Sequence, residues 1–200
     1  MIEKDSRPLY DRRMSSDGPR NGLAPSLLVS MPQLTDPNFS QTVVLLCEHG
    51  PDGAWGLVLN RPTGKTAANA VQLMPPPTGD SGLELWVGGP VEPQRGCLLL
   101  SEPPQGEEAV RIADGLYISV SADLLRRLIE GPQAPRTRLL MGYAGWGPGQ
   151  LDDELTESSW LFSDIALEIV FDTAPSVMWE AAIRRLGADP ANLQTSSGVH

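Results

Sequence analysis

The chain has 200 residues, of which 40% are hydrophobic, 20% are charged and 6% are aromatic. This composition predicts one globular domain with a sizeable core, and it excludes a disordered or fibrous chain. The formal net charge is −10, and no apolar run approaches the roughly 20 residues of a membrane-spanning helix, which argues against an integral membrane protein.

The acidic charge belongs to the body of the chain. Residues 1–22 carry five basic and four acidic side chains, whereas residues 23–200 carry ten basic and 21 acidic ones. The first 22 residues have no hydrophobic periodicity, so we expect a flexible leader before a single domain over 23–200. The N-terminus lacks the apolar core of a secretory signal, and the chain has only two cysteines. Both observations predict a cytoplasmic location.

Short apolar runs separated by turn residues predict a strand-rich domain. The expected strands cover 26–30, 42–48, 55–60, 83–87, 96–101, 110–112, 116–119, 139–143 and 165–171. Two expected helices cover 122–130 and 150–157, and a third begins at 175 and ends at 187. A further candidate covers 66–74. Because strands outnumber helices without strict alternation, the pattern favours an α+β fold over a doubly wound parallel sheet.

Five motifs follow one another along the body of the chain. They read MPQLTDP at 31–37, VVLLCEH at 43–49 followed by GLVLNRP at 56–62, GGPV at 88–91 followed by RG at 95–96, GYAGWGPGQL at 142–151, and WL at 160–161. Together they resemble the YqgE/AlgH family over residues 23–200. The resemblance implies an α+β fold in which a branched mixed sheet closes partly into a small barrel surrounded by helices.

The resemblance implies a fold more than a role. The family carries a transcriptional-regulator label but no accepted enzymatic activity and no agreed ligand, and function belongs to sites rather than to folds. One position departs from the family's pattern, because Leu100 stands where the family commonly has a histidine after Arg-Gly-aromatic-aliphatic-Leu. Chemistry that relies on a histidine there is not expected in this chain.

Cys47 and His49 form the sharpest chemical candidate. If both lie on one regular strand, positions two apart share a face, and an imidazolium lowers the pKa of a neighbouring thiol. That arrangement favours a thiol-based redox sensor or enzyme. The alternative is that Cys47, which ends an apolar run, packs as a small hydrophobe.

Other catalytic and metal sites find little support in the sequence. Two cysteines and two histidines without compact spacing do not predict a zinc site. The chain also lacks the Gly-x-Ser-x-Gly elbow that is typical of serine hydrolases. We therefore expect no metal and no cofactor, and the balance favours a non-catalytic protein over an enzyme.

The glycine-rich stretch 142–149 is a candidate ligand-binding loop, because it leads into a helix whose first N–H groups attract anions. The expected binding residues are Asn60, Arg61, Gly88, Gly89, Tyr143, Trp146 and Gly149. The alternative is a turn that requires glycine and packs its two aromatic side chains in the core. The leading hypothesis is a cytoplasmic binding or regulatory protein with a protein or small-molecule partner.

The charge distribution predicts that the protein does not bind duplex DNA at physiological salt. Non-specific DNA affinity comes largely from cations that release counterions from phosphates, and residues 23–200 have a net charge of −11. A fluorescence-anisotropy titration with a labelled duplex should show no saturable binding. Sub-micromolar, sequence-selective binding would contradict this prediction.

Overall fold

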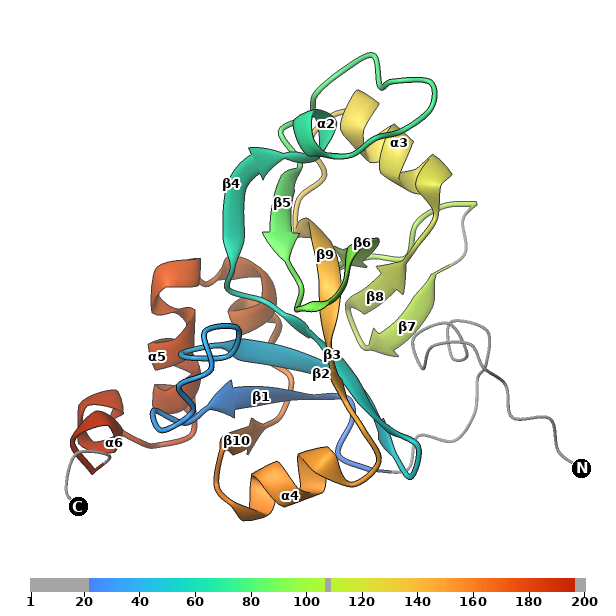
Figure 1. Ribbon diagram of the computed structural model, residues 1–200. Coiled ribbons are helices and arrows are strands. Elements are labelled where there is room, and N and C mark those ends of the chain that lie inside the picture. Colours follow the sequence, from blue (N-terminus) through green and yellow to red (C-terminus); the bar gives the residue numbers. More distant parts are fainter. Residues whose placement is uncertain (1–21, 107–108, 197–200) are drawn as a thin grey trace, which may run out of the picture.

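A single mixed sheet of ten strands organises the computed structural model, which describes residues 22–106 and 109–196 (Figure 1). The strands are β1 (Ser26–Ser30), β2 (Val43–Gly50), β3 (Gly53–Val58), β4 (Pro62–Thr66), β5 (Glu84–Val87), β6 (Val91–Leu100), β7 (Val110–Ala113), β8 (Leu116–Ser119), β9 (Thr137–Trp146) and β10 (Trp160–Ser163). The helices are α2 (Ala67–Ala70), α3 (Ala122–Glu130), α4 (Gln150–Thr156), the π-helix η1 (Glu168–Asp172), α5 (Pro175–Arg185) and α6 (Pro190–Ser196). The leader predicted over residues 1–22 lies outside the described residues except for its last position.

Strand β9 is the centre of the sheet and has different neighbours at its two ends. Antiparallel β6 follows one of its edges. On the other edge, β5 pairs with it in parallel from Leu139 to Met141, and β3 pairs with it antiparallel from Ala144 to Trp146. The sheet therefore branches near Gly142 and curls into a half-barrel (Figure 1). This confirms the predicted α+β fold with a branched mixed sheet.

Glycine makes the branch possible because main chains pack there without side chains between them. The Gly88 N–H donates to the Met141 carbonyl at 2.7 Å, and the Gly88 carbonyl accepts from the Val58 N–H at 2.8 Å. A Cβ atom at Gly89 would overlap the main chain of Tyr143. Gly89 also has a φ of 153°, which L side chains rarely adopt. The GGPV motif thus joins the two arms of the sheet.

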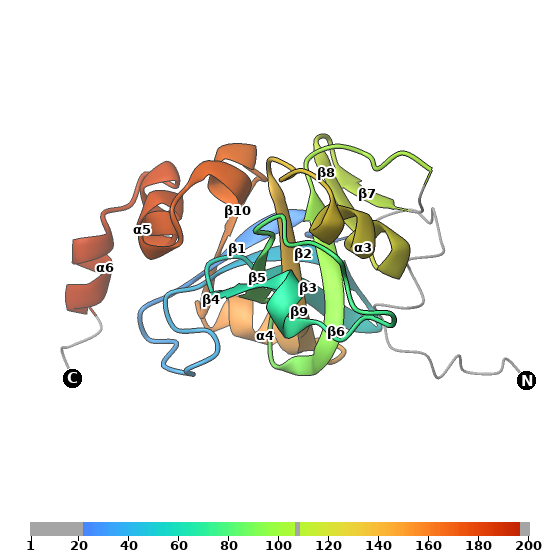
Figure 2. The same cartoon turned by 90° about the horizontal axis from the view of Figure 1, so that it is seen from above.

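Three apolar clusters pack against the sheet. The first lies under η1 and α5 and includes Leu45, Trp86 and Met178. The second lies on the opposite face of β1 and β2, where α4 covers it, and the third lies under α2 and α3. Figure 2 shows α5 and α3 at opposite sides of the molecule, with the sheet between them.

Helix α3 shows how the sequence specifies its ends. The Ser121 hydroxyl accepts a hydrogen bond from the Leu124 N–H at 3.1 Å, which satisfies a free donor of the first turn. Leu124, Leu125 and Ile129 are buried on one face. The helix ends before Gly131, as predicted.

The strand predicted over 165–171 is wrong, because this segment forms η1 instead. Its buried residues are Ala166, Ile169 and Val170, which have the i, i+3, i+4 spacing of a helical face rather than the alternation of a strand. A short run rich in β-branched residues is ambiguous from periodicity alone. The actual strand, β10, comes just before it and was not predicted.

Smaller differences also follow from tertiary contacts. Strand β4 is exposed and polar, so it gave no apolar signal, and α6 was not predicted. The helix expected over 66–74 shortens to the four residues of α2, and β6 and β9 each extend beyond their apolar cores. In residues 22–106 and 109–196, no helix has both the length and the apolar character needed to cross a membrane.

We expect Gly89→Ala to destabilise the fold severely, by about 3 kcal/mol or more, because the new Cβ atom collides with main chain that cannot move aside. Gly50→Ala is the matched control, since no atom lies within 4 Å of a Cβ built there. Urea denaturation of both variants measures the difference. Equal unfolding free energies for the two variants would show that the branch does not depend on this contact.

Candidate functional site

A β-bulge separates the two members of the predicted thiol pair. Leu46 pairs with Gly56 and Glu48 pairs with Trp55, so Cys47 is the extra residue between them. The bulge shifts the alternation of side chains along β2. The prediction that Cys47 and His49 share a face assumed a regular strand, and that assumption fails here.

The contacts of the two side chains place them in different surroundings. Cys47 is 6% exposed and packs in the first apolar cluster, with its Sγ 3.5 Å from the Leu45 carbonyl oxygen. The His49 ring accepts a hydrogen bond from the Leu23 N–H at its Nδ1 and contacts the Asp152 carboxylate of α4 through its Nε2. The structure therefore does not bring the thiol and the imidazole together.

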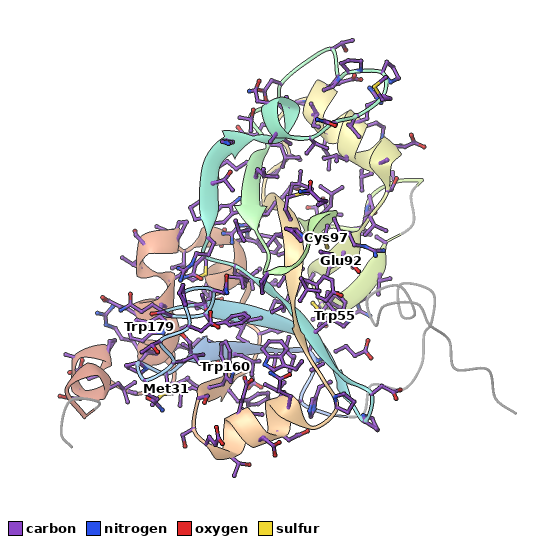
Figure 3. All side chains as sticks on the ribbon, in the orientation of Figure 1. Met31, Trp55, Glu92, Cys97, Trp160 and Trp179 are labelled. Carbon is purple, nitrogen blue, oxygen red and sulfur yellow. The ribbon has the colours of Figure 1, made fainter. Side chains whose placement is uncertain are left out.

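Trp146, one of the two aromatic residues of the glycine-rich loop, has structural partners. Glu154 of α4 accepts hydrogen bonds from the indole N–H groups of Trp146 at 2.9 Å and Trp160 at 2.8 Å. Phe39 packs against both indoles, which meet edge to face with centroids 5.9 Å apart. Figure 3 shows Trp160 on the side of the sheet that carries α4. Trp146 therefore helps to dock α4 and is not available to a ligand.

The other residues of this loop also serve packing. Tyr143 is 9% exposed and meets the Trp55 ring edge to face, and Trp55 lies beside the β9 ribbon in Figure 3. Gly149 has a φ of 76° at the position before α4. The Gln150 side chain accepts from the Gly147 N–H at 3.1 Å. The alternative of a glycine-requiring turn describes this loop better than a ligand loop.

Asn60 and Arg61 form hydrogen bonds with the segment that leads into β2. The Asn60 side chain accepts from the Val43 N–H and donates to the Gln41 carbonyl, while Arg61 donates to the Ser40 carbonyl. Burial lowers the pKa of Arg61, because desolvation disfavours its charged form.

Two of the seven predicted binding residues do share a cavity. Arg61 and Gly89 line a hollow of about 240 Å³ whose other walls are mostly valine and proline. Neither Tyr143 nor Trp146 lines it. The structure thus brings together only part of the predicted binding set.

A larger cavity, of about 450 Å³, shares Pro62 with this hollow and was not predicted. Its walls come from β5, the start of β9, the segment 133–136 and the junction between η1 and α5. Figure 2 shows the short helical segment before α5 beside the start of β9. The polar and charged residues that line it are Ser81, Glu84, Gln133, Arg136, Thr137, Arg138, Asp172 and Thr173.

Arg138 is the central cation of this cavity. It is only 6% exposed, and its guanidinium carbon lies 4.2 Å from the centroid of the Trp86 ring, within the range of a cation–π interaction. Its Nη1 donates to the Leu59 carbonyl at 2.9 Å and its Nη2 donates to the Phe171 carbonyl at 3.4 Å. These contacts hold the guanidinium in one orientation between the residue after β3, strand β5 and η1.

The charge of Arg138 persists at neutral pH. Burial lowers the pKa of Arg138 to about 10, because desolvation disfavours the charged form, while the carboxylates of Glu84 and Asp172 act in the opposite direction. Among the described residues, no carboxylate lies close enough to form an ion pair with it. The cavity therefore contains a buried cation that Glu84 and Asp172 balance through space, without an ion-pair contact.

Trp86 adds a second unusual group to the same cavity. Its side chain is 4% exposed, and within the described part of the chain its indole Nε1 has no hydrogen-bond acceptor. Buried N–H groups are nearly always paired in folded proteins, so this unpaired one is an unusual feature of a residue that lines the cavity.

An exposed ion pair stands at the edge of the cavity. Arg136 donates from Nε to Asp172 Oδ1 at 2.9 Å and from Nη2 to Asp172 Oδ2. The two side chains are 47% and 44% exposed, so this pair lies in solvent whereas Arg138 lies inside. Arg136 has a φ of 47°, an uncommon value for a residue with a side chain.

One sequence signal pointed to this cavity. Arg138 immediately precedes the apolar run LLM, part of the strand predicted from 139 to 143. Charged residues are rarely buried, so one at the end of a central strand is informative. The predicted strand began one residue too late to include it. Trp86 gave no signal, because an aromatic residue in a strand is typical of a core.

The cavity has no evident metal ligands. Over residues 22–106 and 109–196, no three His, Cys, Asp or Glu side chains lie close enough together to hold a metal ion.

A family model and individual relatives match this chain consistently. The sequence model described as "DUF179: AlgH-like" matches residues 27–191. A UPF0301 protein of Myxococcus xanthus is 42% identical over 180 residues, which cover 89% of this chain and 98% of the relative. A UPF0301 protein of Paracoccus denitrificans is 40% identical over 184 residues, which cover 89% and 97%.

A solved structure agrees with these sequence matches. The solution structure of the AlgH protein from Pseudomonas aeruginosa superposes with a TM-score of 0.71 and 34% identity, over 92% of this chain and 99% of that one. The names of these relatives state no activity.

We expect Cys47 to behave as a packed thiol, since it is 6% exposed and a buried thiol reacts slowly. In Cys97→Ser protein, alkylation of Cys47 across pH 5 to 9 should be slow and should accelerate only after unfolding in urea. His49→Ala should leave the rate unchanged, because the ring contacts α4 instead of the thiol. Fast modification at pH 6 that is lost in Cys47→Ser and reduced in His49→Ala would restore the redox alternative.

Proposed function

We propose that this chain, which belongs to the AlgH-like family as its motifs predicted, is a non-catalytic cytoplasmic binding protein whose ligand carries an anionic group. The ligand site is the 450 Å³ cavity, and the group that holds the anion is Arg138. The observation that carries the proposal is the burial of this cation without an ion-pair partner among the described residues.

The energetics of a buried guanidinium support an anionic ligand. Desolvating a charge costs several kcal/mol, and a paired counter-charge in the same low-dielectric site is needed to offset that cost. Arg138 already uses two donors on main-chain carbonyls, but a guanidinium has five N–H groups in a rigid fork. A carboxylate or phosphate matches that fork and forms short, charge-assisted hydrogen bonds.

The composition of the cavity walls supports binding rather than catalysis. The described residues that line the cavity include neither His nor Cys, and its hydroxyl groups have no neighbouring base in the arrangement that activates a nucleophile. Leucine, proline, tryptophan and phenylalanine side chains supply the apolar surface that small-molecule sites commonly have.

Any regulatory role then depends on the ligand or on a protein partner. The net charge of −10 disfavours direct contact with DNA. A protein that binds a small anion can pass this signal to a protein partner, and it then needs no DNA-binding surface of its own.

The proposal predicts that small carboxylates bind at Arg138. In ¹H–¹⁵N NMR titrations with 3-phenylpropionate and, separately, with inorganic phosphate, at least one probe should shift the Trp86 indole N–H signal, which Trp86→Phe identifies. Arg138→Met should weaken that binding at least about ten-fold, the loss expected for one charge-assisted contact.

Two further variants, which change only exposed side chains, accompany this test. Arg136→Gln changes an exposed side chain at the edge of the cavity and should weaken binding by a smaller factor, because its charge acts from solvent. Arg184→Gln, on an exposed pair of α5, is the control and should bind the probe as the unaltered protein does. Binding that survives in Arg138→Met with a native spectrum would refute the site.

A further inference from the structure

The register of two parallel strands places charges of both signs in the cavity. Leu85 of β5 pairs with Leu139 of β9, and alternate residues of a strand share a face. Glu84 and Trp86 therefore lie on the same side of the sheet as Arg138, and all three line the cavity. A carboxylate and a guanidinium thus face one hollow from neighbouring strands.

These two charges do not neutralise each other by contact. No ion pair joins Glu84 to Arg138, although the carboxylate raises the pKa of that guanidinium through space. Within the described residues, the Glu84 side chain has no hydrogen-bond donor or ion-pair partner, and it is exposed. The second carboxylate of the cavity, Asp172, is already held by both ends of the Arg136 fork. Glu84 is therefore the carboxylate that a ligand can engage.

Apolar walls complete the cavity. Leu83, Leu128, Trp86, Phe171 and three prolines line it beside the charged groups. An apolar substituent of a ligand gains free energy by covering such surface. A volume of about 450 Å³ lies within the usual range for small-molecule sites.

We propose that the ligand is a zwitterion, namely a free α-amino acid with an apolar side chain. Its carboxylate binds Arg138, its ammonium group binds the Glu84 carboxylate, and its side chain covers the apolar wall. An α-amino acid carries its carboxylate and its ammonium group on one carbon, as two charges of opposite sign on neighbouring strands require. This inference rests on the proposed anion site and adds a requirement for a positive group.

The test compares matched molecules that differ by one charged group. Isothermal titration or NMR titration is carried out with L-phenylalanine, 3-phenylpropionate and 2-phenylethylamine, and with L-leucine, 4-methylpentanoate and 3-methylbutylamine. In at least one series, the amino acid should bind about ten-fold tighter than either analogue, the gain expected for one added charge-assisted contact.

Glu84→Gln tests the role assigned to the carboxylate. The ratio of the affinities for the amino acid and its deaminated analogue should fall to about one in this variant. Glu157→Gln is the matched control, because Glu157 is exposed at the end of α4 on the other face of the sheet, and the ratio should stay as in the unaltered protein.

The outcomes separate the inference from the proposal beneath it. If the deaminated analogue binds as tightly as the amino acid in both series, the zwitterion inference is wrong and the anion site stands. If Glu84→Gln keeps the full preference for the amino acid, the inference is likewise wrong. If neither acids nor amino acids bind, the proposed function fails as well.

Discussion

The contact between the Gly88-Gly89 turn and the main chain of β9 is the constraint on which the rest of the fold depends. At this point one edge of β9 passes from β5 to β3, and Gly88 bonds to both arms of the sheet. Side chains larger than hydrogen have no space there. The branch directs β4 and β5 away from β1 to β3, and the cavity around Arg138 lies between β5, the start of β9 and the junction of η1 and α5.

The buried cation has two roles that do not conflict. Arg138 connects Leu59, the residue after β3, to the end of η1 through two carbonyl groups, and the Trp86 ring packs against the guanidinium. A group that is fixed by the fold binds a ligand without the entropic cost of being ordered, which is the general advantage of preorganisation. The same contacts that position η1 therefore prepare the cavity for an anion.

The sequence predicted what depends on local patterns. The strand that contains Cys47 and the capped helix after Ser121 have short-range signals, and both appear in the structure. The expected shared face of Cys47 and His49 is absent, because the extra residue in β2 depends on how β3 pairs with it, which periodicity does not reveal. The Arg138 cavity needs β5 and β9 to meet in parallel, although more than forty residues separate them in the sequence. The sequence offers the Arg138 charge beside a strand, but which residues surround it follows only from the topology.

The central position of β9 has a consequence for biosynthesis. β3 and β5 leave the ribosome long before their common partner, because β9 lies in the last third of the chain. Until β9 arrives, both earlier strands expose unpaired edges, which are templates for wrong pairing. The nascent chain must also close long loops before β9 is paired, so its folding is expected to be slow for its size. Expression at low temperature, or with chaperones that cover open edges, should therefore favour the native protein over aggregates.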